Sequence, residues 1–427
     1  MSNPRVFSPW QFSKDLRSSP SLLFFAFFFV LQGLDISKDY AEVAGVALRD
    51  WAIELNCLPG ALHYYMCAAF LISTLSIVAF KKTVYIPKAL KPFLILICAF
   101  VGVGLLAGLI GENDEKLVLL EASTWMFYLA LPFFVFITRV KKAWRSVYTV
   151  LLIYTVIIMA KTLVSFIVDF YSHIAYLKVF VRGNFFLIPL FFTLILLAVY
   201  KKKWVYLFSS IFLLITIILT GMRGNFLGVI VGSLYLLIFY RKSGQIYKYL
   251  FAGLLVVMSF VIIGEITGLP LNKLLGFWGD TFENGLNYRL TQFHQLLQKF
   301  IESPFWGKGF GLVLYDYEGF ADTLVKPYLQ ELEWMNFIAK TGLIGGLSLV
   351  GAFVMLLKWI NKVSYKARTD EQKFILQGLA CGLVAMLTAT LSNTLISSIL
   401  FHLYVFCVVS ITAGVASESE VDFVIVK

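Results

Sequence analysis

Charged side chains are scarce in this chain. Only 14% of its 427 residues are charged, 59% are hydrophobic, and the mean hydropathy is +0.83. Soluble domains carry roughly 25% charged residues, so this composition excludes a soluble protein with a single core. The formal net charge is nevertheless +11. We expect no nucleic-acid partner, because in a membrane protein the positive-inside rule accounts for an excess of lysine and arginine.

The residues that bind metals or act as nucleophiles are also few. The five cysteines form no CxxC pair or other metal spacing, the four histidines are far apart, and no serine nucleophile elbow is present. The sequence therefore predicts neither a metal nor a cofactor. Four cysteines fall in expected membrane spans, where we expect buried, inert thiols. These four are Cys67, Cys98, Cys381 and Cys407.

Long apolar runs are abundant. They recur at about 17–25 residues, enough to cross a bilayer as helices, and they are apolar all round rather than alternating as barrel strands do. The sequence predicts an all-α integral membrane protein with about twelve spans. The expected spans lie near 20–34, 60–80, 92–110, 117–138, 146–167, 184–200, 204–220, 225–240, 249–268, 334–357, 374–392 and 398–416.

The distribution of charge predicts the orientation. If the N-terminus is cytoplasmic, every short inner loop is basic, whereas outer loops such as 35–56 lean acidic. Both termini are then cytoplasmic, as expected for a multi-pass protein of a bacterial inner membrane. No small-residue cleavage site follows the first apolar run, so a cleavable signal peptide is not expected.

One long hydrophilic stretch, 269–333, separates spans nine and ten and faces the periplasm in this topology. It divides the chain into spans one to nine (1–268), the loop, and spans ten to twelve with a tail (334–427). Within the loop, residues 288–301 favour an amphipathic helix lying at the membrane surface. Its apolar face comprises Leu290, Phe293, Leu297, Phe300 and Ile301.

Three arginines on the outer side are unexpected under the positive-inside rule. Arg182 and Arg223 each open an Arg-Gly-Asn-Phe sequence at the outer end of a span, and Arg289 begins the amphipathic segment. An arginine beside hydrocarbon is costly unless it is paired or hydrated, and its planar fork suits phosphate oxygens. Together the three would suit a lipid-linked pyrophosphate. Separately, each could reach the headgroups or pair with a local carboxylate.

Two carboxylates, Glu331 and Glu333, precede the tenth span. The dipole of that helix favours an ionised carboxylate near its N-terminus, and an ionised carboxylate can act as a general base toward a sugar hydroxyl. Helix capping is the alternative. The glycine-rich stretch Ser303–Gly311 lacks the following Lys-Ser/Thr of a phosphate loop, so we expect a Pro/Gly turn there.

These features together resemble the bacterial O-antigen ligase and polymerase superfamily. The resemblance rests on the large loop between spans nine and ten, on Thr220–Leu227 (TGMRGNFL), on Tyr288–Leu290 followed by Phe300–Gly309 (FIESPFWGKG), and on Gly342–Gly345. It covers roughly residues 180–350. Ligases of the family carry a histidine where this chain has Glu331, and polymerases are more variable there. The difference favours a polymerase.

The resemblance implies a metal-independent, inverting glycosyl transfer on the periplasmic face. The donor would be a glycan on undecaprenyl diphosphate, and the acceptor a lipid-linked repeat unit. Arg223 and Arg289, with Arg182, would neutralise the leaving pyrophosphate, Arg289 acting directly in catalysis. Glu331 would orient or deprotonate the acceptor, with Glu333 in reserve. A chain-length regulator and a flippase of the same pathway are the expected partners.

Two other functions stay open at this point. A ligase would join finished O-antigen to lipid A-core and would differ from a polymerase only in its acceptor. A transporter of a polar or anionic solute would require membrane-buried charges, for which Glu121, Lys161 and Glu265 are the candidates.

Overall fold

The computed structural model describes residues 87–88, 90–126, 128, 131–132, 135, 144–171, 184–220, 223–240, 280–314, 332–391, 396 and 398–419. Within these residues the regular structure is entirely helical. The helices are α6 (Leu90–Ile110), α7 (Glu115–Met126), α9 (Trp144–Tyr171), η2 (Asn184–Phe186), α10 (Leu187–Lys201), α11 (Trp204–Leu219), α12 (Arg223–Phe239), α15 (Asp280–Glu302), α16 (Glu333–Tyr365), α17 (Asp370–Ala389) and α18 (Ile399–Glu418).

Six segments of the described residues are long and apolar enough to cross a membrane. They are Leu90–Ile110, Trp144–Val164, Asn184–Lys201, Glu333–Tyr365, Asp370–Ala389 and Leu400–Glu418. Two shorter apolar helices, Trp204–Leu219 and Gly224–Phe239, accompany them. The prediction of an all-helical, multi-pass membrane protein is therefore confirmed. The count of about twelve spans stays a prediction, because the spans expected at 20–34, 60–80 and 249–268 lie outside the described residues.

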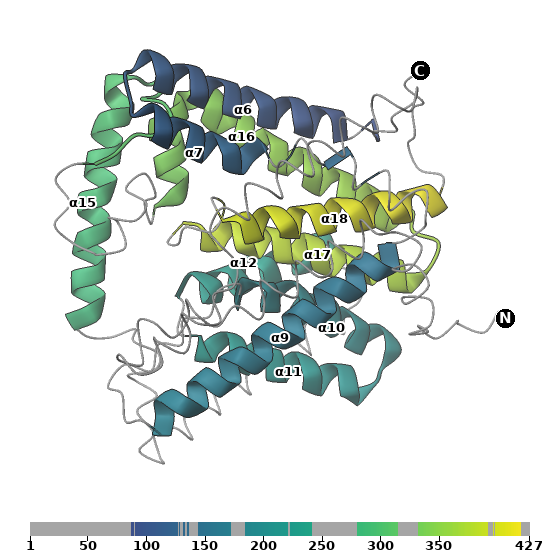
Figure 1. The fold of residues 1–427 in the computed structure, drawn as a ribbon. Coiled ribbons are helices and arrows are strands. Elements are labelled where there is room, and N and C mark those ends of the chain that lie inside the picture. The colour runs from purple at the N-terminus through teal and green to yellow at the C-terminus, as the bar shows by residue number, and fades with distance from the viewer. Residues whose placement is uncertain are drawn as a thin grey trace, which may run out of the picture.

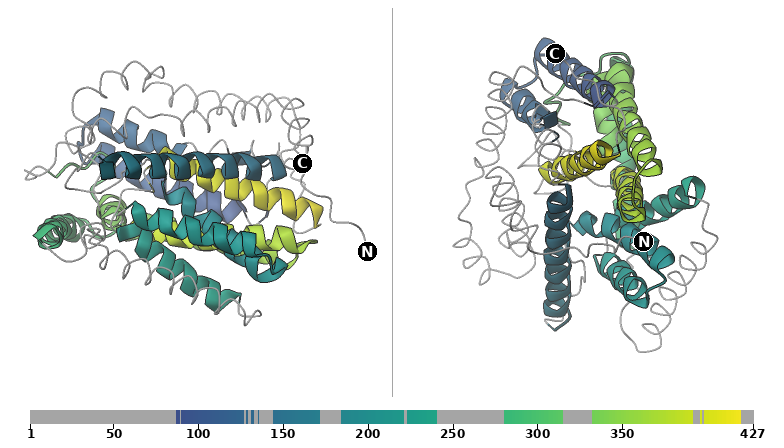
Figure 2. Two further views of the ribbon diagram at one scale, coloured as in Figure 1. Left: turned by 90° about the horizontal axis from the view of Figure 1, so that it is seen from below. Right: turned by 90° about the vertical axis from the view of Figure 1, so that its right-hand side faces the viewer.

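The long helices form a bundle, and α15 stands across one end of it (Figure 1). The left view of Figure 2 looks along α15 and shows it at the same end. We call this the α15 end of the bundle. Helices α10, α12, α16 and α18 begin at the α15 end, whereas α9 and α17 begin at the opposite end, as hydrogen bonds described below demonstrate.

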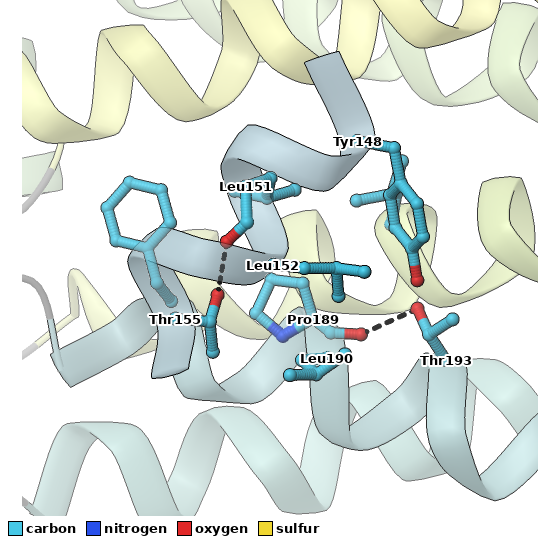
Figure 3. A pocket seen from close by; sticks show the side chains of 9 residues that line it. Tyr148, Leu151, Leu152, Thr155, Pro189, Leu190 and Thr193 are labelled. Atoms are coloured by element: carbon cyan, nitrogen blue, oxygen red, sulfur yellow. Dashed lines mark hydrogen bonds between the residues drawn. The ribbon is translucent and has the colours of Figure 1, made fainter. Parts of the chain in front are cut away.

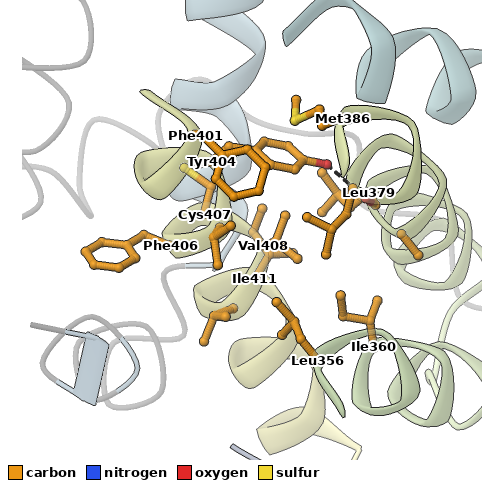
Figure 4. Close-up of a cluster of buried hydrophobic side chains, with 14 of the residues drawn as sticks. Leu356, Ile360, Leu379, Met386, Phe401, Tyr404, Phe406, Cys407, Val408 and Ile411 are labelled. Carbon is orange, nitrogen blue, oxygen red and sulfur yellow. Dashed lines mark hydrogen bonds between the residues drawn. The ribbon is translucent and has the colours of Figure 1, made fainter. Parts of the chain in front are cut away.

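The centre of the bundle is built around α18. In the apolar part of α18 that is long enough to span a membrane, 94% of the residues are buried, compared with 33% in that of α6. Helix α18 is therefore central and α6 peripheral. Figure 4 shows Phe401 and Tyr404 of α18 packed with side chains of α16 and α17, and the Tyr404 hydroxyl donates to the Leu379 carbonyl at 2.8 Å.

The peripheral position of α6 corrects one prediction. Cys381 and Cys407 are buried as expected, but Cys98 on α6 is exposed. Helix α6 buries Phe93 and Ile97 against the bundle, and its opposite face, which carries Cys98, points outward. Sequence alone could not distinguish the two faces, because both are apolar. Cys67 lies outside the described residues.

Polar side chains join helix ends at the opposite end of the bundle. The Trp144 indole N–H at the start of α9 donates to Glu418 at the end of α18 at 3.0 Å, and Gln372 near the start of α17 donates to the same carboxylate at 2.6 Å. Tyr200 at the end of α10 donates to Asp370. The starts of α9 and α17 therefore lie beside the ends of α10 and α18. That this end is cytoplasmic stays a prediction.

Helix α16 is broken at Gly342, whose φ of 61° and ψ of −164° are not helical. An unbroken helix would bond the N–H groups of residues 343 and 344 to the carbonyls of residues 339 and 340. The segment Ser303–Gly311 replaces both bonds with four of its own. Leu343 and Ile344 donate to Pro304 and Phe305 at 2.8 and 3.3 Å, while Lys308 and Gly309 donate to Ala339 and Lys340 at 2.9 and 2.7 Å.

This insertion explains why Ser303–Gly311 is rich in glycine. Gly307, Gly309 and Gly311 all have positive φ, and a Cβ at Gly309 would lie 2.0 Å from the backbone nitrogen of Gly108 in α6. Phe310 then donates its N–H to the Gly104 carbonyl at 2.8 Å. The expectation of a Pro/Gly turn was therefore incomplete, because the segment is a backbone wedge between α6 and the break in α16.

We predict that Gly309→Ala lowers the melting temperature of the purified protein in detergent, while Gly102→Ala leaves it unchanged or raises it slightly. Alanine at 309 meets backbone atoms and a strained φ of 87°, which costs more than about 1 kcal/mol. Gly102 lies in the same helix as Gly108, and no heavy atom lies within 4 Å of a Cβ built there. Equal melting curves for the two variants would contradict the wedge.

Candidate active site

The first turn of α16 is fastened to its neighbours at the α15 end. The Glu333 side chain is fully buried, and its Oε2 accepts the Ile396 N–H at 2.7 Å. The Trp334 indole N–H donates to the Leu387 carbonyl of α17 at 3.0 Å. Glu333 thus has a structural task as a backbone acceptor. This task favours Glu331, which lies outside the described residues, as the first candidate for a base.

Helix α15 is amphipathic, as predicted, and longer than the expected 288–301. Its bundle-facing side buries Leu296 in a small cluster with Leu312, Leu314 and Ala339. Most of the predicted apolar face points away from the protein, with Leu290 47% and Ile301 66% exposed. A bilayer surface would cover such a face, and the position of α15 across the helix ends suits that arrangement.

Two polar contacts hold α15 to the rest of the chain. The fully buried Gln292 accepts the N–H of Leu332, the residue before α16, at 3.0 Å. At the C-terminal end of α15, Glu302 pairs with Lys308 of the wedge at 2.8 Å. The hydrogen bond from Lys308 holds the pKa of Glu302 below its usual value. Helix α15 is therefore anchored both to the start of α16 and to the wedge.

Arg289 lies on the anchored side of α15. It precedes Gln292 by three residues, a spacing that places both on one helix face, and its side chain is half-buried. Gln292 binds the backbone directly after Glu331. The geometry therefore places Arg289 on the side of α15 that faces the start of α16, where both candidate carboxylates occur in the sequence.

The two Arg-Gly-Asn-Phe sequences come together in space. Asn225 of α12 donates from Nδ2 to Oδ1 of Asn184 at 3.0 Å, and both side chains are buried. Arg223 is the first residue of α12, while Arg182 lies outside the described residues. The repeat is visible in the sequence, but only its arginines were predicted to be functional. The asparagines that join the two segments were not predicted.

Helix α17 links α12 to α16. A Cβ at Gly228 of α12 would lie 2.4 Å from the carbonyl oxygen of Ala385, so the two backbones are in close contact there. Two residues further along α17, the Leu387 carbonyl binds Trp334. The last turns of α17 therefore place the start of α12, with Arg223, near the start of α16, with Glu333. Arg223, Arg289 and Glu333 all lie at the α15 end, where α15 packs on α16 and α17 links α12 to α16.

A buried ion pair lies one step deeper in the bundle. Lys340 Nζ is 2.8 and 3.0 Å from the two carboxylate oxygens of Glu121, and Oε2 of Glu121 also accepts the Gly311 N–H at 2.9 Å. Both side chains are essentially inaccessible, at 0% and 2% exposure. Glu121 was a candidate transport charge, but here it joins α7, α16 and the wedge. Its partner Lys340 was not singled out from the sequence.

The histidines of the described residues are His294 on α15 and His402 on α18. His402 is buried on α18, where its Nδ1 lies 3.0 Å from the Tyr128 hydroxyl and its ring packs edge-on against Trp125. His294 is exposed on α15 beside Phe293. Within the described ranges no three side chains of His, Cys, Asp or Glu gather as a metal site would require.

A small pocket between α9, α10 and α17 is a separate feature (Figure 3). Most of its lining side chains are apolar, and the hydroxyl-bearing ones are Tyr148, Thr155 and Thr193. The Thr155 and Thr193 hydroxyls donate to carbonyls of their own helices, those of Leu151 and Pro189. None of the candidate arginines or glutamates lines this pocket, so it does not form part of the candidate site.

Comparison with known proteins supports the resemblance drawn from the motifs. Residues 208–350 match the O-antigen ligase family. This segment contains Arg223, α15 with Arg289, the wedge and the broken first half of α16. No curated protein matches the chain. The match covers part of the chain and does not distinguish a ligase from a polymerase.

We predict that removing one partner of the buried ion pair destabilises the protein more than removing both. Glu121→Gln or Lys340→Met alone leaves a buried charge or polar group without its partner, which costs about 3–5 kcal/mol. The double variant removes both charges, and glutamine at 121 keeps an acceptor for Gly311. Melting temperatures in detergent measure the difference. If the two single losses simply added in the double variant, the pair would not be coupled.

Proposed function

We propose that this protein belongs to the O-antigen ligase and polymerase superfamily and is a surface-polysaccharide polymerase. It transfers a growing glycan from undecaprenyl diphosphate to the terminal hydroxyl of a lipid-linked repeat unit, on the periplasmic face of a bacterial inner membrane. The alternative within the superfamily is a ligase that moves finished O-antigen to lipid A-core.

One observation carries the proposal. Helix α15, which carries Arg289, packs on the start of α16, and α17 links the start of α12, which carries Arg223, to the same end of the bundle. A membrane-bound diphosphate would be presented at this end. Guanidinium groups bind diphosphate oxygens through paired hydrogen bonds. Arg182 joins them in the proposal because the Asn184–Asn225 hydrogen bond connects its segment to the start of α12.

The proposed reaction is a direct displacement. Glu331 takes the proton of the acceptor hydroxyl, whose oxygen attacks the anomeric carbon of the donor sugar. The bond from that carbon to the diphosphate breaks on the opposite face, so the configuration inverts. The electron pair leaves with undecaprenyl diphosphate, and the arginines stabilise the negative charge that develops there. Glu333 remains the reserve base, and no metal takes part.

Two observations bear on the alternatives. Glu331 stands where family ligases carry a histidine, which favours a polymerase. A transporter would need buried charges along a solute path. Glu121 instead pairs with Lys340 and caps Gly311, and Glu265 lies outside the described residues. A chain-length regulator and a flippase acting in the same pathway are the partners that a polymerase requires.

The test is deletion of the gene in its host, followed by separation of extracted lipopolysaccharide on a silver-stained gel. Loss of the long ladder with core plus a single repeat unit remaining identifies a polymerase. Complete loss of attached repeats, with long glycan accumulating on the lipid carrier, identifies a ligase. An unchanged ladder and unchanged surface glycans would contradict both and favour transport.

Complementation of the deletion strain tests the residues. We predict that Arg223→Ala, Arg289→Ala and Glu331→Ala fail to restore the ladder. Losing a charge that stabilises the leaving group costs about 10²–10³ in rate, and losing the general base costs about 10²–10⁴. Arg289→Lys restores it only weakly, since lysine cannot make paired hydrogen bonds. Arg368→Ala, at an exposed arginine between α16 and α17, is the matched control and restores the ladder fully. Equal ladders from all variants would exclude this site.

A further inference from the structure

Each of the two family arginines in the described residues is followed in its own helix by a buried side-chain amide bound to another element. Asn225 follows Arg223 by two residues and binds Asn184, and Gln292 follows Arg289 by three residues and binds the N–H of Leu332. We infer that these amides are positioning residues, which hold the two arginines at the spacing that lets both bind one diphosphate. The inference rests on the proposed function.

Gln292 is the better defined of the two. Its side chain is fully buried although α15 is an exposed, amphipathic helix, and its Oε1 reaches across to the backbone immediately before α16 at 3.0 Å. One helical turn earlier, Arg289 shares that face. Because a helix is rigid over a single turn, fixing Gln292 against α16 also fixes the backbone of Arg289 relative to the segment that contains Glu331.

Asn225 fixes the start of α12 in the same way. It makes its hydrogen bond from the first turn of the helix, two residues after Arg223. The bond connects two segments that each read Arg-Gly-Asn-Phe, and both asparagine side chains are buried. A buried amide that loses its partner is costly, so the pair holds the two helix starts at a fixed spacing.

Neutral amides suit this task better than charges. A carboxylate at 292, one turn from Arg289, would pair with that arginine and compete with the phosphates for its N–H groups. An amide supplies a directional bond without cancelling the arginine's charge. The buried ion pair of Glu121 and Lys340 lies on other elements, α7 and the inner part of α16, where it stabilises the wedge instead.

The experiment measures affinity for farnesyl diphosphate, a short-chain probe, by calorimetry on the purified full-length protein in detergent. Farnesyl monophosphate serves as the comparator, and the melting temperature is recorded for every variant. Gln292→Leu and Asn225→Leu are expected to weaken diphosphate binding about tenfold or more, because displacing a contact by an ångström has effects of that size. Gln292→Ala and Asn184→Ala break the same bonds and replace any leucine variant that does not fold.

A structural role alone would give a different pattern. Because each amide acts through its arginine, Gln292→Leu should weaken binding no further in an Arg289→Ala background, and Asn225→Leu no further in an Arg223→Ala background. Two matched controls should lower stability at most and keep the diphosphate affinity. The first control is Gln295→Leu, one turn beyond Gln292, where the Gln295 Oε1 accepts no hydrogen bond among the described residues. The second is Asn361→Leu, which removes a hydrogen-bonded amide at the opposite end of the bundle.

Three results would overturn the inference. Amide variants that bind the diphosphate like the wild type, effects that add to those of the arginine variants, or controls that lose affinity equally would each do so. In all three cases Arg223→Ala and Arg289→Ala would still weaken binding, and the proposed function would stand. If the arginine variants bind the diphosphate as the wild type does, the proposed function itself fails.

Discussion

The backbone exchange at Gly342 is the contact on which the arrangement of the site depends. A helix break within a membrane leaves N–H and C=O groups that no water can satisfy, at a cost of several kcal/mol for each group. The wedge Ser303–Gly311 satisfies four of them, two on each side of the break. The same wedge follows directly from α15, so the bonds that repair α16 also fix the helix that carries Arg289.

Buried charge in the described residues serves mainly to hold this arrangement together. Glu121 and Lys340 neutralise each other and cap the wedge, and Glu333 accepts a backbone N–H from the segment before α18. In our proposal the catalytic roles therefore fall to three other residues. Arg223 and Arg289 stabilise the leaving diphosphate, and Glu331 takes the proton of the acceptor hydroxyl. This division separates the groups that stabilise the α15 end from those that would meet a substrate.

Sequence predicted what depends on local pattern and missed what depends on distant contacts. The membrane helices and the amphipathic α15 follow from composition and periodicity, and both were found. The pairing of Glu121 with Lys340, 219 residues apart, and of Asn184 with Asn225 has no local signature. Likewise, glycines that allow a wedge to enter a helix break look like a turn until the broken helix is seen. The exposed Cys98 shows that an apolar helix does not reveal which face it buries.

The most direct test of the account is reconstitution. Purified protein in lipid vesicles would be supplied only with the lipid-linked repeat unit extracted from a host that lacks the gene, and products would be followed by gel and mass spectrometry. A metal-independent polymerase should form chains of two or more repeats in the presence of a metal chelator, with one undecaprenyl diphosphate released for each bond formed. Transfer that occurs only when lipid A-core is added, or no transfer at all, would contradict the proposed function.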